Sequence, residues 1–155
     1  MQLINKIKMV LGLLKPDAIL LIIRIVVGII FMQTGFGKLS HLADTTLFFT
    51  DLGIPFPAQN ALLASATEFM GGCLLILGLA TRFIAIPLTV IMVIAILTTQ
   101  FAALQSVSEF IRLQELDYML FFITLFLAGP GKLSIDHLIR RYYINEPEKR
   151  GRKKS

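Results

Sequence analysis

Four apolar stretches, each about as long as a membrane-spanning helix, constrain the fold of this chain more than any other feature. They are residues 18–37, 61–80, 83–104 and 111–129. The hydrocarbon core of a bilayer is about 30 Å thick, so a helix needs about 20 mostly apolar residues to cross it. Because the chain has 155 residues, four such helices leave little room for another domain. The sequence therefore predicts an all-α membrane protein built as a bundle of four transmembrane helices.

The composition agrees with this fold class. Hydrophobic residues make up 55% of the chain and charged residues 16%, against about 45–50% and 25% in soluble domains. The weakest stretch is 111–129, because Asp117 leaves an unbroken apolar run only over 118–128. We count it as a span, since a carboxylate near the outer end is tolerated when it faces the bundle.

The distribution of Lys and Arg predicts the topology, because cytoplasmic segments are enriched in these residues. With both termini in the cytoplasm, the outer segments are a longer loop over 38–60 and a short one near 105–110. In this multi-pass arrangement only Lys38 and Arg112 lie outside, and Arg24 lies within a span. The other twelve lie on the cytoplasmic side: Lys6, Lys8, Lys15, Arg82, Lys132, Arg140, Arg141, Lys149, Arg150, Arg152, Lys153 and Lys154.

One short amphipathic helix is expected near each end of the sequence. The bundle itself covers residues 18–138. In segment 1–17 the apolar residues fall on one helical stripe, which predicts a helix lying along the inner leaflet. After the helix-stopping sequence GPG at 129–131, Ser134 is expected to cap a second interfacial helix. The basic tail, 139–155, is expected to be disordered and to contact anionic membrane lipids rather than nucleic acid.

Three ionisable side chains lie within the predicted spans: Arg24, Glu68 and Asp117. Such groups cost about 2.5–3.5 kcal/mol each on insertion scales, so they suggest a function. Cα–Cβ bonds tilt toward a helix's N-terminus, so Lys38 on the outgoing first helix leans into the membrane and Glu68 on the returning second helix leans outward. We expect these two side chains to meet. Arg24 is expected to snorkel to the cytoplasmic headgroups, and an Arg24–Glu68 pair is the less favoured alternative.

An outward-opening polar pocket is predicted around the Lys38–Glu68 pair. In this interpretation Glu68 and Lys38 relay a proton. The binding residues would be Arg24, Gln33, Gln100, Asp117, Phe31 and Phe121. The alternative is a structural ion pair that only fixes the helix register, and the sequence leaves both open. Neither haem nor metal is expected, because His41 and His137 lie on opposite sides of the membrane and the single Cys cannot build a cysteine-rich site.

A series of motifs in order resembles the DoxX family of small bacterial membrane proteins. They are R-x3-G at 24–28, GFGKL at 35–39, LGIP at 52–55, TEFMGG at 67–72, LGLATR at 77–82 and GPGKLS at 129–134. The resemblance covers about 18–138 and implies a four-helix protein of the bacterial inner membrane. By matching position it implies that Arg24, Lys38 and Glu68 form the functional polar set. Relatives that end the third helix with a His differ from this chain, which has TTQF at 98–101, so no haem or metal role is carried over.

The resemblance implies a subunit of a quinone-linked oxidoreductase, such as those acting on thiosulfate, or a partner in thiol and oxidative-stress defence. The leading hypothesis is a quinone-interacting subunit that receives electrons from a partner redox protein, because the chain has no evident electron carrier. The alternatives are a proton-coupled carrier for a small solute, which needs access from both faces, and an assembly or scaffold protein for an export or metal-peptide system. Whether the chain is catalytic stays open. So does whether its small-residue faces pack within one chain or between copies in a homo-oligomer.

Overall fold

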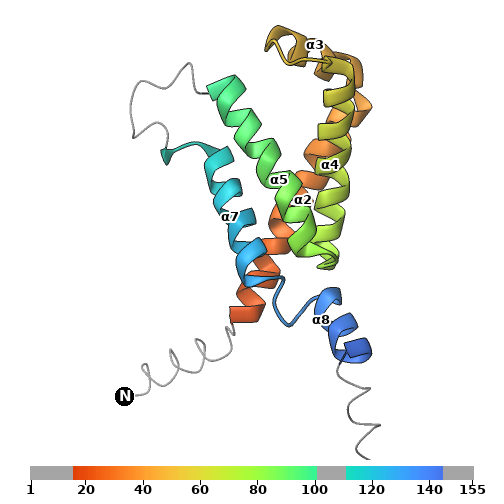
Figure 1. Cartoon of the computed structure of the whole chain (residues 1–155), viewed down its shortest axis with the longest axis vertical. Helices are drawn as coiled ribbons and strands as arrows, with labels where there is room; N and C mark the ends of the chain where they lie inside the picture. The colour runs from red at the N-terminus through yellow and green to blue at the C-terminus, as the bar shows by residue number, and fades with distance from the viewer. Residues whose placement is uncertain (1–15, 101–110, 145–155) are drawn as a thin grey trace, which may run out of the picture.

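All regular elements in the described part of the chain are helices (Figure 1). The computed structural model describes residues 16–100 and 111–144. Most of the predicted interfacial segment 1–17, the outer turn near 105–110 and the tail from 145 onward lie outside the described residues. The helices are α2 (Pro16–Ser40), α3 (Leu42–Asp51), α4 (Pro57–Leu77), α5 (Thr81–Ala95), the π-helical turn η1 (Ile96–Gln100), α7 (Gln114–Ala128), α8 (Ile135–Ile139) and the π-helical turn η3 (Arg140–Ile144).

Three helical stretches are long and apolar enough to cross a membrane: Asp17–Ser40, Pro57–Leu77 and Thr81–Thr99. The predicted all-α membrane fold is confirmed to that extent. α7 has 15 residues, and at 1.5 Å per residue it is about 22 Å long. It is shorter than the predicted stretch because Leu113 is extended and the helix begins only at Gln114. Residues 140–144, which were expected to belong to the disordered tail, are helical.

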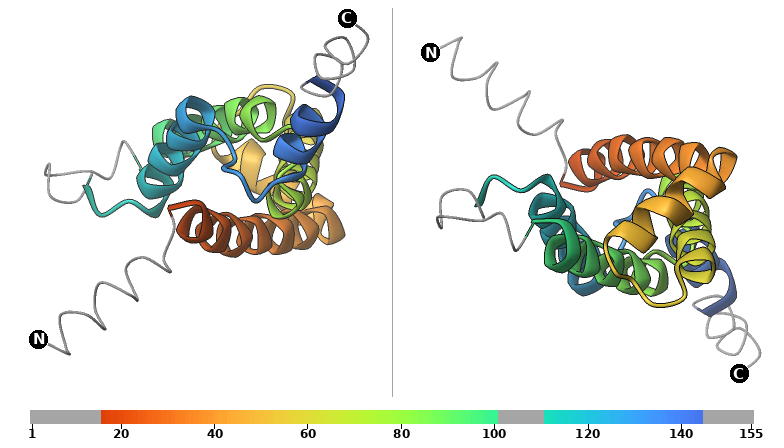
Figure 2. Two further views of the ribbon diagram at one scale, coloured as in Figure 1. Left: turned by 90° about the horizontal axis from the view of Figure 1, so that it is seen from below. Right: turned by 90° about the horizontal axis from the view of Figure 1, so that it is seen from above.

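The helices form two arms that meet at one end of the molecule and diverge toward the other (Figure 1). α2 packs along α4 in one arm, and α5 packs along α7 in the other. We call the end with the α4–α5 turn and α8 the inner end, and the end with α3 the outer end. Seen from above, α3 crosses the space between the arms (Figure 2). The core where the arms meet contains Val27, Phe31, Leu75, Ala85, Leu88, Met92, Phe122 and Leu125.

Glycines hold the α2–α4 arm together by allowing the two backbones to touch. A Cβ atom added at Gly35 would overlap the backbone nitrogen of Phe69, and one at Gly72 would overlap that of Met32. Gly28 is packed similarly, because its Cβ would lie 2.9 Å from the Gly72 carbonyl oxygen. Small residues permit this approach in membranes, where van der Waals packing drives helix association. These small-residue faces therefore pack against each other within one chain.

The inner end is held by Arg24, whose side chain is 1% exposed. Its Nη1 donates a hydrogen bond to the Pro130 carbonyl oxygen and its Nη2 donates to that of Leu133 at 2.8 Å. The expectation that Arg24 snorkels to the headgroups is therefore wrong. The reason is that carbonyls from the turn after α7 accept hydrogen bonds from both terminal nitrogens of the buried guanidinium inside the fold. Arg24 also does not pair with Glu68, which binds Lys38 instead.

Asp136 fastens the same segment to the α4–α5 turn. Its carboxylate accepts hydrogen bonds from the backbone N–H groups of Ala80 at 2.8 Å and Thr81 at 2.9 Å. Its own N–H donates to the Gly78 carbonyl at 3.0 Å. These bonds satisfy the first N–H groups of α5, as a capping side chain would. The predicted cap of α8 is confirmed, because the Ser134 hydroxyl accepts from the His137 N–H.

Replacing Gly35 by Ala should destabilise the fold, because the added methyl group overlaps the backbone of α4. Overpacking of this kind costs about 1–3 kcal/mol. Gly37→Ala is the matched control on the same helix, since no atom lies within 4 Å of its added Cβ. Thermal unfolding in detergent, followed by circular dichroism, should show a lower midpoint for Gly35→Ala and an unchanged or higher one for Gly37→Ala. Equal midpoints for the two variants would contradict the packing described here.

Candidate functional site

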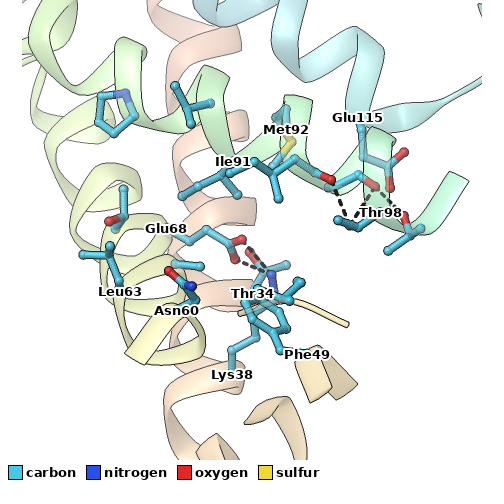
Figure 3. Close-up of a pocket in the computed structure, with 18 of the residues that line it drawn as sticks. Thr34, Lys38, Phe49, Asn60, Leu63, Glu68, Ile91, Met92, Thr98 and Glu115 are labelled. Carbon is cyan, nitrogen blue, oxygen red and sulfur yellow. Dashed lines mark hydrogen bonds and ion pairs between the residues drawn. The ribbon is translucent and has the colours of Figure 1, made fainter. Parts of the chain in front are cut away.

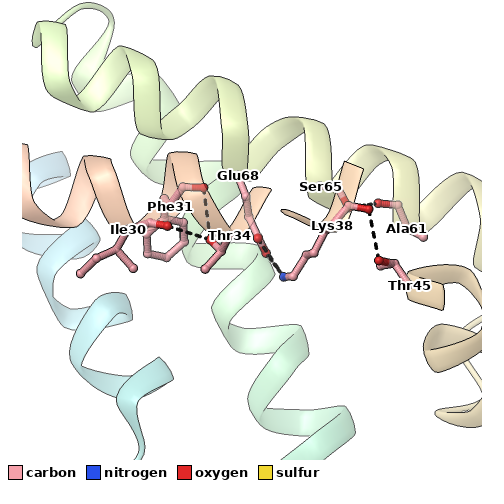
Figure 4. Close-up of polar contacts among 8 residues, drawn as sticks. All are labelled: Ile30, Phe31, Thr34, Lys38, Thr45, Ala61, Ser65 and Glu68. Atoms are coloured by element: carbon pink, nitrogen blue, oxygen red, sulfur yellow. Dashed lines mark hydrogen bonds and ion pairs between the residues drawn. The ribbon is translucent and has the colours of Figure 1, made fainter. Parts of the chain in front are cut away.

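Lys38 and Glu68 form an ion pair between α2 and α4 (Figure 4). The Lys38 Nζ atom lies 2.6 Å from Oε1 and 2.8 Å from Oε2 of Glu68, so the ammonium donates to both carboxylate oxygens. The meeting of these two side chains, predicted from the tilt of their Cα–Cβ bonds, is therefore confirmed. Their proposed role in proton relay stays a prediction.

The close packing of the two helices positions this pair. Gly35 lies three residues before Lys38, and Phe69 directly follows Glu68. A Cβ at Gly35 would lie only 2.8 Å from the Ser65 carbonyl oxygen, one turn before Glu68. Because α2 and α4 touch here, a Lys side chain spans the remaining distance to the carboxylate. The motifs GFGKL and TEFMGG thus supply both the contact and the charges.

The two partners differ in burial. The Glu68 side chain is 3% exposed, whereas that of Lys38 is 40% exposed. A carboxylate buried without a partner costs several kcal/mol, so Lys38 compensates a charge that the fold would otherwise not tolerate. An ammonium group has three N–H donors, and two of them point to Glu68. Among the described residues only Glu68 accepts from this ammonium group, so one N–H stays available.

The ion pair lies in the wall of a cavity of about 920 Å³ between the two arms (Figure 3). α2 and α4 form one wall, and α5, η1 and α7 form the other. At the outer end α3 contributes Phe48 and Phe49, and Leu52 directly after it also lines the cavity. Most of the lining side chains are apolar. The arrangement is a large, mostly apolar cavity, and Lys38 is the cationic side chain among its described lining residues.

Most other polar side chains in the cavity wall already have hydrogen-bond partners. Thr34, Thr98 and Thr99 each donate to a carbonyl one turn earlier in the same helix, at 3.0, 2.8 and 2.6 Å. The Gln114 amide nitrogen donates to the Tyr118 hydroxyl at 2.6 Å. These contacts consume donors, and the oxygens of the threonine hydroxyls remain able to accept.

Phe31 lines the cavity as predicted. Its ring makes edge-to-face contacts with Tyr118 and Phe122, with ring centroids 5.1 and 5.0 Å apart. Such geometry suits the aromatic quadrupole and fixes the rings. This cluster joins α2 to α7, and two of its members, Phe31 and Tyr118, line the cavity.

Other predicted binding residues do not line the cavity. Gln33 is exposed, because it lies about 100° around the helix from its neighbour Thr34, which faces the cavity. Asp117 is also exposed, and Phe121 is half-buried against the core. The Gln100 side chain lies outside the described residues. Arg24 belongs to the inner end, away from this cavity.

The sequence analysis did not identify the face of α7 that lines the cavity. Glu115 and Tyr118 face the cavity, and Phe122 and Leu125 continue this face into the core. The spacing of three, four and three residues is a helical stripe, and its large aromatic and aliphatic members were a usable signal. The prediction chose the face of Asp117 because a membrane carboxylate was expected to turn inward. Asp117 lies in the first turn of α7, where the helix end allows it to face outward.

Comparison with known proteins finds the same relationship that the motifs suggested. The DoxX family model matches residues 19–100, more than half of the chain. The chain is 31% identical over 121 residues to a Bacillus subtilis (strain 168) protein named "Putative oxidoreductase CatD", covering 77% of this chain and 85% of that protein. It is 32% identical over 131 residues to "Uncharacterized membrane protein Rv3486" of Mycobacterium tuberculosis, covering 77% and 80%. "Inner membrane protein YqjF" of Escherichia coli (strain K12) is 27% identical over 126 residues, covering 81% and 95%. No solved structure matches the chain significantly.

Removing one partner of the ion pair should cost more than removing both. Lys38→Met leaves the buried Glu68 carboxylate without its cation and should lower the free energy of unfolding by about 1–3 kcal/mol. The double variant Lys38→Met/Glu68→Met removes that charge and should recover at least half of the loss. Thermal unfolding in detergent measures both, with the exposed Lys132→Met as a control for the loss of one positive charge. A double variant no more stable than Lys38→Met would show that the unpaired carboxylate is not the main cause of the destabilisation.

Proposed function

This chain belongs to the DoxX family, and from that premise we propose that it is the quinone-binding membrane subunit of an oxidoreductase system. One observation carries the proposal: a Lys38 ammonium, backed by the buried Glu68 carboxylate, faces a large apolar cavity. The name of the Bacillus subtilis relative supports the reaction class.

The chemistry of the cavity fits a quinone head group. A quinone is an apolar ring with carbonyl oxygens that accept hydrogen bonds, and the third N–H of Lys38 is a donor for one of them. The volume of about 920 Å³ lies within the roughly 300–1,000 Å³ typical of small-molecule sites. Phe31 and Tyr118 supply aromatic surface for the ring.

The openings of the cavity favour a lipid-soluble ligand. α4 and α5 touch near the inner end, where a Cβ at Gly71 would meet the Leu88 side chain at 3.0 Å, and they diverge toward the outer end (Figure 1). Apolar side chains of α4 and α5 line the cavity where these helices diverge, and large fractions of them are exposed. They are Leu63, Ile86, Val90 and Ile94.

Bound quinone supplies two-electron, two-proton redox chemistry. In this proposal Lys38 holds a proton at one ring oxygen, and Glu68 accepts or returns protons through the ammonium group. The electrons come from a partner redox protein, since the described residues include no evident electron carrier. The chain's contribution is to bind and orient the ring and to manage protons at one oxygen.

A proton-coupled carrier is less well supported, because it needs a route to the inner face. At the inner end Arg24 and the segment it binds occupy the place where such a route would pass. A scaffold role requires only the ion pair and does not explain the large cavity. The quinone site uses both features.

We also propose a topology of four spans with both termini in the cytoplasm. α7 then crosses the membrane as the fourth span, with the flanking segments completing its length. α8 carries exposed Leu138 and Ile139 and is followed by exposed Arg140 and Arg141. This pattern suits a helix at the inner surface of the membrane, with apolar residues in lipid and cations at the headgroups.

The purified protein should release a quinone in native mass spectrometry, and calorimetry should detect rebinding. Lys38→Met removes a charged donor, so it should weaken quinone binding about tenfold or more. Asp117→Asn, exposed on α7, is the matched control and should bind like the wild type. The proposal fails if the wild type binds no quinone and Glu68→Gln leaves respiratory activity unchanged.

The topology is tested with single cysteines at the two ends of α7, in a background where Cys73 is replaced by Ala. An impermeant maleimide added to intact spheroplasts should label Arg112→Cys. It should label Lys132→Cys only after the membrane is permeabilised, because the two positions lie on opposite faces. Labelling of both from the same side would mean that α7 re-enters and does not cross.

A further inference from the structure

We propose that Glu115 is a second ligand-binding group of the cavity and makes it prefer a hydroquinone over the corresponding quinone. This inference rests on the quinone site proposed above and adds a specificity-determining residue to it. It follows from which donors and acceptors in the cavity wall are already engaged.

Glu115 lies on the opposite arm from the ion pair. It is in the first turn of α7, is half-buried and lines the same cavity as Lys38 and Glu68. Figure 3 shows it beside Thr98, across the cavity from the Glu68 carboxylate. Within residues 16–100 and 111–144 it has no hydrogen bond or ion pair. The described cavity wall therefore has charged groups on both arms, the Lys38–Glu68 pair on one and Glu115 on the other, and we call these its two poles.

Glu115 is placed at the start of a helix, in the first turn of α7. The first turn of a helix carries unpaired N–H groups and the positive end of the helix dipole, both of which stabilise an anion. Partial exposure leaves the carboxylate some contact with water. An ionised carboxylate accepts hydrogen bonds and cannot donate them.

The two redox forms of the ligand differ in whether they can donate a hydrogen bond. Both oxygens of a quinone only accept hydrogen bonds, whereas the hydroxyl groups of a hydroquinone also donate. Lys38 can donate to either a carbonyl or a hydroxyl oxygen. The Tyr118 hydroxyl, which accepts from Gln114, still has its own proton and also serves either form.

Among the charged groups of the described cavity wall, Glu115 alone interacts differently with the quinone and the hydroquinone. Both Glu68 oxygens already accept from Lys38, so Glu68 offers little to a ligand. At Glu115 a hydroquinone hydroxyl makes a charge-assisted hydrogen bond, while a quinone carbonyl would set its lone pairs against those of the carboxylate. In this proposal Lys38 holds one oxygen of a ring with oxygens at its 1 and 4 positions, and Glu115 holds the other.

The test measures two dissociation constants for the full chain in lipid nanodiscs without oxygen. The probes are decylubiquinone and its hydroquinone, and the readout is isothermal titration calorimetry. The wild type should bind the hydroquinone about tenfold more tightly, as expected for one charge-assisted hydrogen bond. Glu115→Gln should abolish or reverse this preference, because an amide donates to a carbonyl. Asp117→Asn, two residues along the same helix, should keep it.

A ligand-side measurement makes the test independent of how any variant folds. The 1,4-dimethoxy derivative of the same ring accepts hydrogen bonds but cannot donate them. On the wild type it should bind no more tightly than the quinone. Binding as tight as that of the hydroquinone would show that donation to Glu115 does not matter.

The outcomes separate this inference from the proposed function. Equal affinity of the wild type for both forms, or an unchanged preference in Glu115→Gln, overturns the role of Glu115 and leaves the quinone site standing. Absence of binding of either form to the wild type overturns both. If Lys38→Met weakens the binding of both forms alike and retains the preference for the hydroquinone, the result supports separate roles for the two poles.

Discussion

A buried guanidinium determines how the helices of this protein meet. Arg24 lies inside the fold at membrane depth, where an unsatisfied charge is costly, so it requires acceptors from the protein itself. It obtains them from the carbonyls of Pro130 and Leu133, more than a hundred residues away in sequence. Asp136 then ties the same segment to the start of α5. The two arms are therefore joined at the inner end and can diverge only toward the outer end.

The divergence creates the cavity, and helix packing decides which charges reach it. In the α2–α4 arm the glycines bring two backbones into contact, so the Glu68 carboxylate is buried between its own helix pair. Lys38, one turn beyond Gly35 on the longer helix, reaches around that contact and stays partly exposed to the cavity. The other arm presents aromatic and aliphatic side chains, with Glu115 near its outer end. The chemistry of the site thus follows from an asymmetry in packing.

Features that follow from the direction of each helix and the tilt of its side chains could be predicted from the sequence. Contacts with segments far away in the sequence could not. Helix direction and side-chain tilt were sufficient to bring Lys38 and Glu68 together. The partner of Arg24 was not predictable, because its acceptors are backbone carbonyls that no residue pattern marks. α7 was assigned the wrong face because it is apolar nearly all round, so a single carboxylate, Asp117, decided the choice. In the structure the inward face is set by Phe122 packing on Phe31.

A ligand held at both poles would join the two arms where the protein itself leaves them apart. The inner end is already fixed by Arg24 and by the core, so this added connection would act mainly on the outer half. α3 lies across that half, packs on α4 and contributes Phe49 to the cavity. Closure of the α5–α7 arm onto a ring would bring its apolar wall toward α3 and reduce the water around Glu115. Loss of water strengthens a charge-assisted hydrogen bond, so binding and closure would reinforce each other.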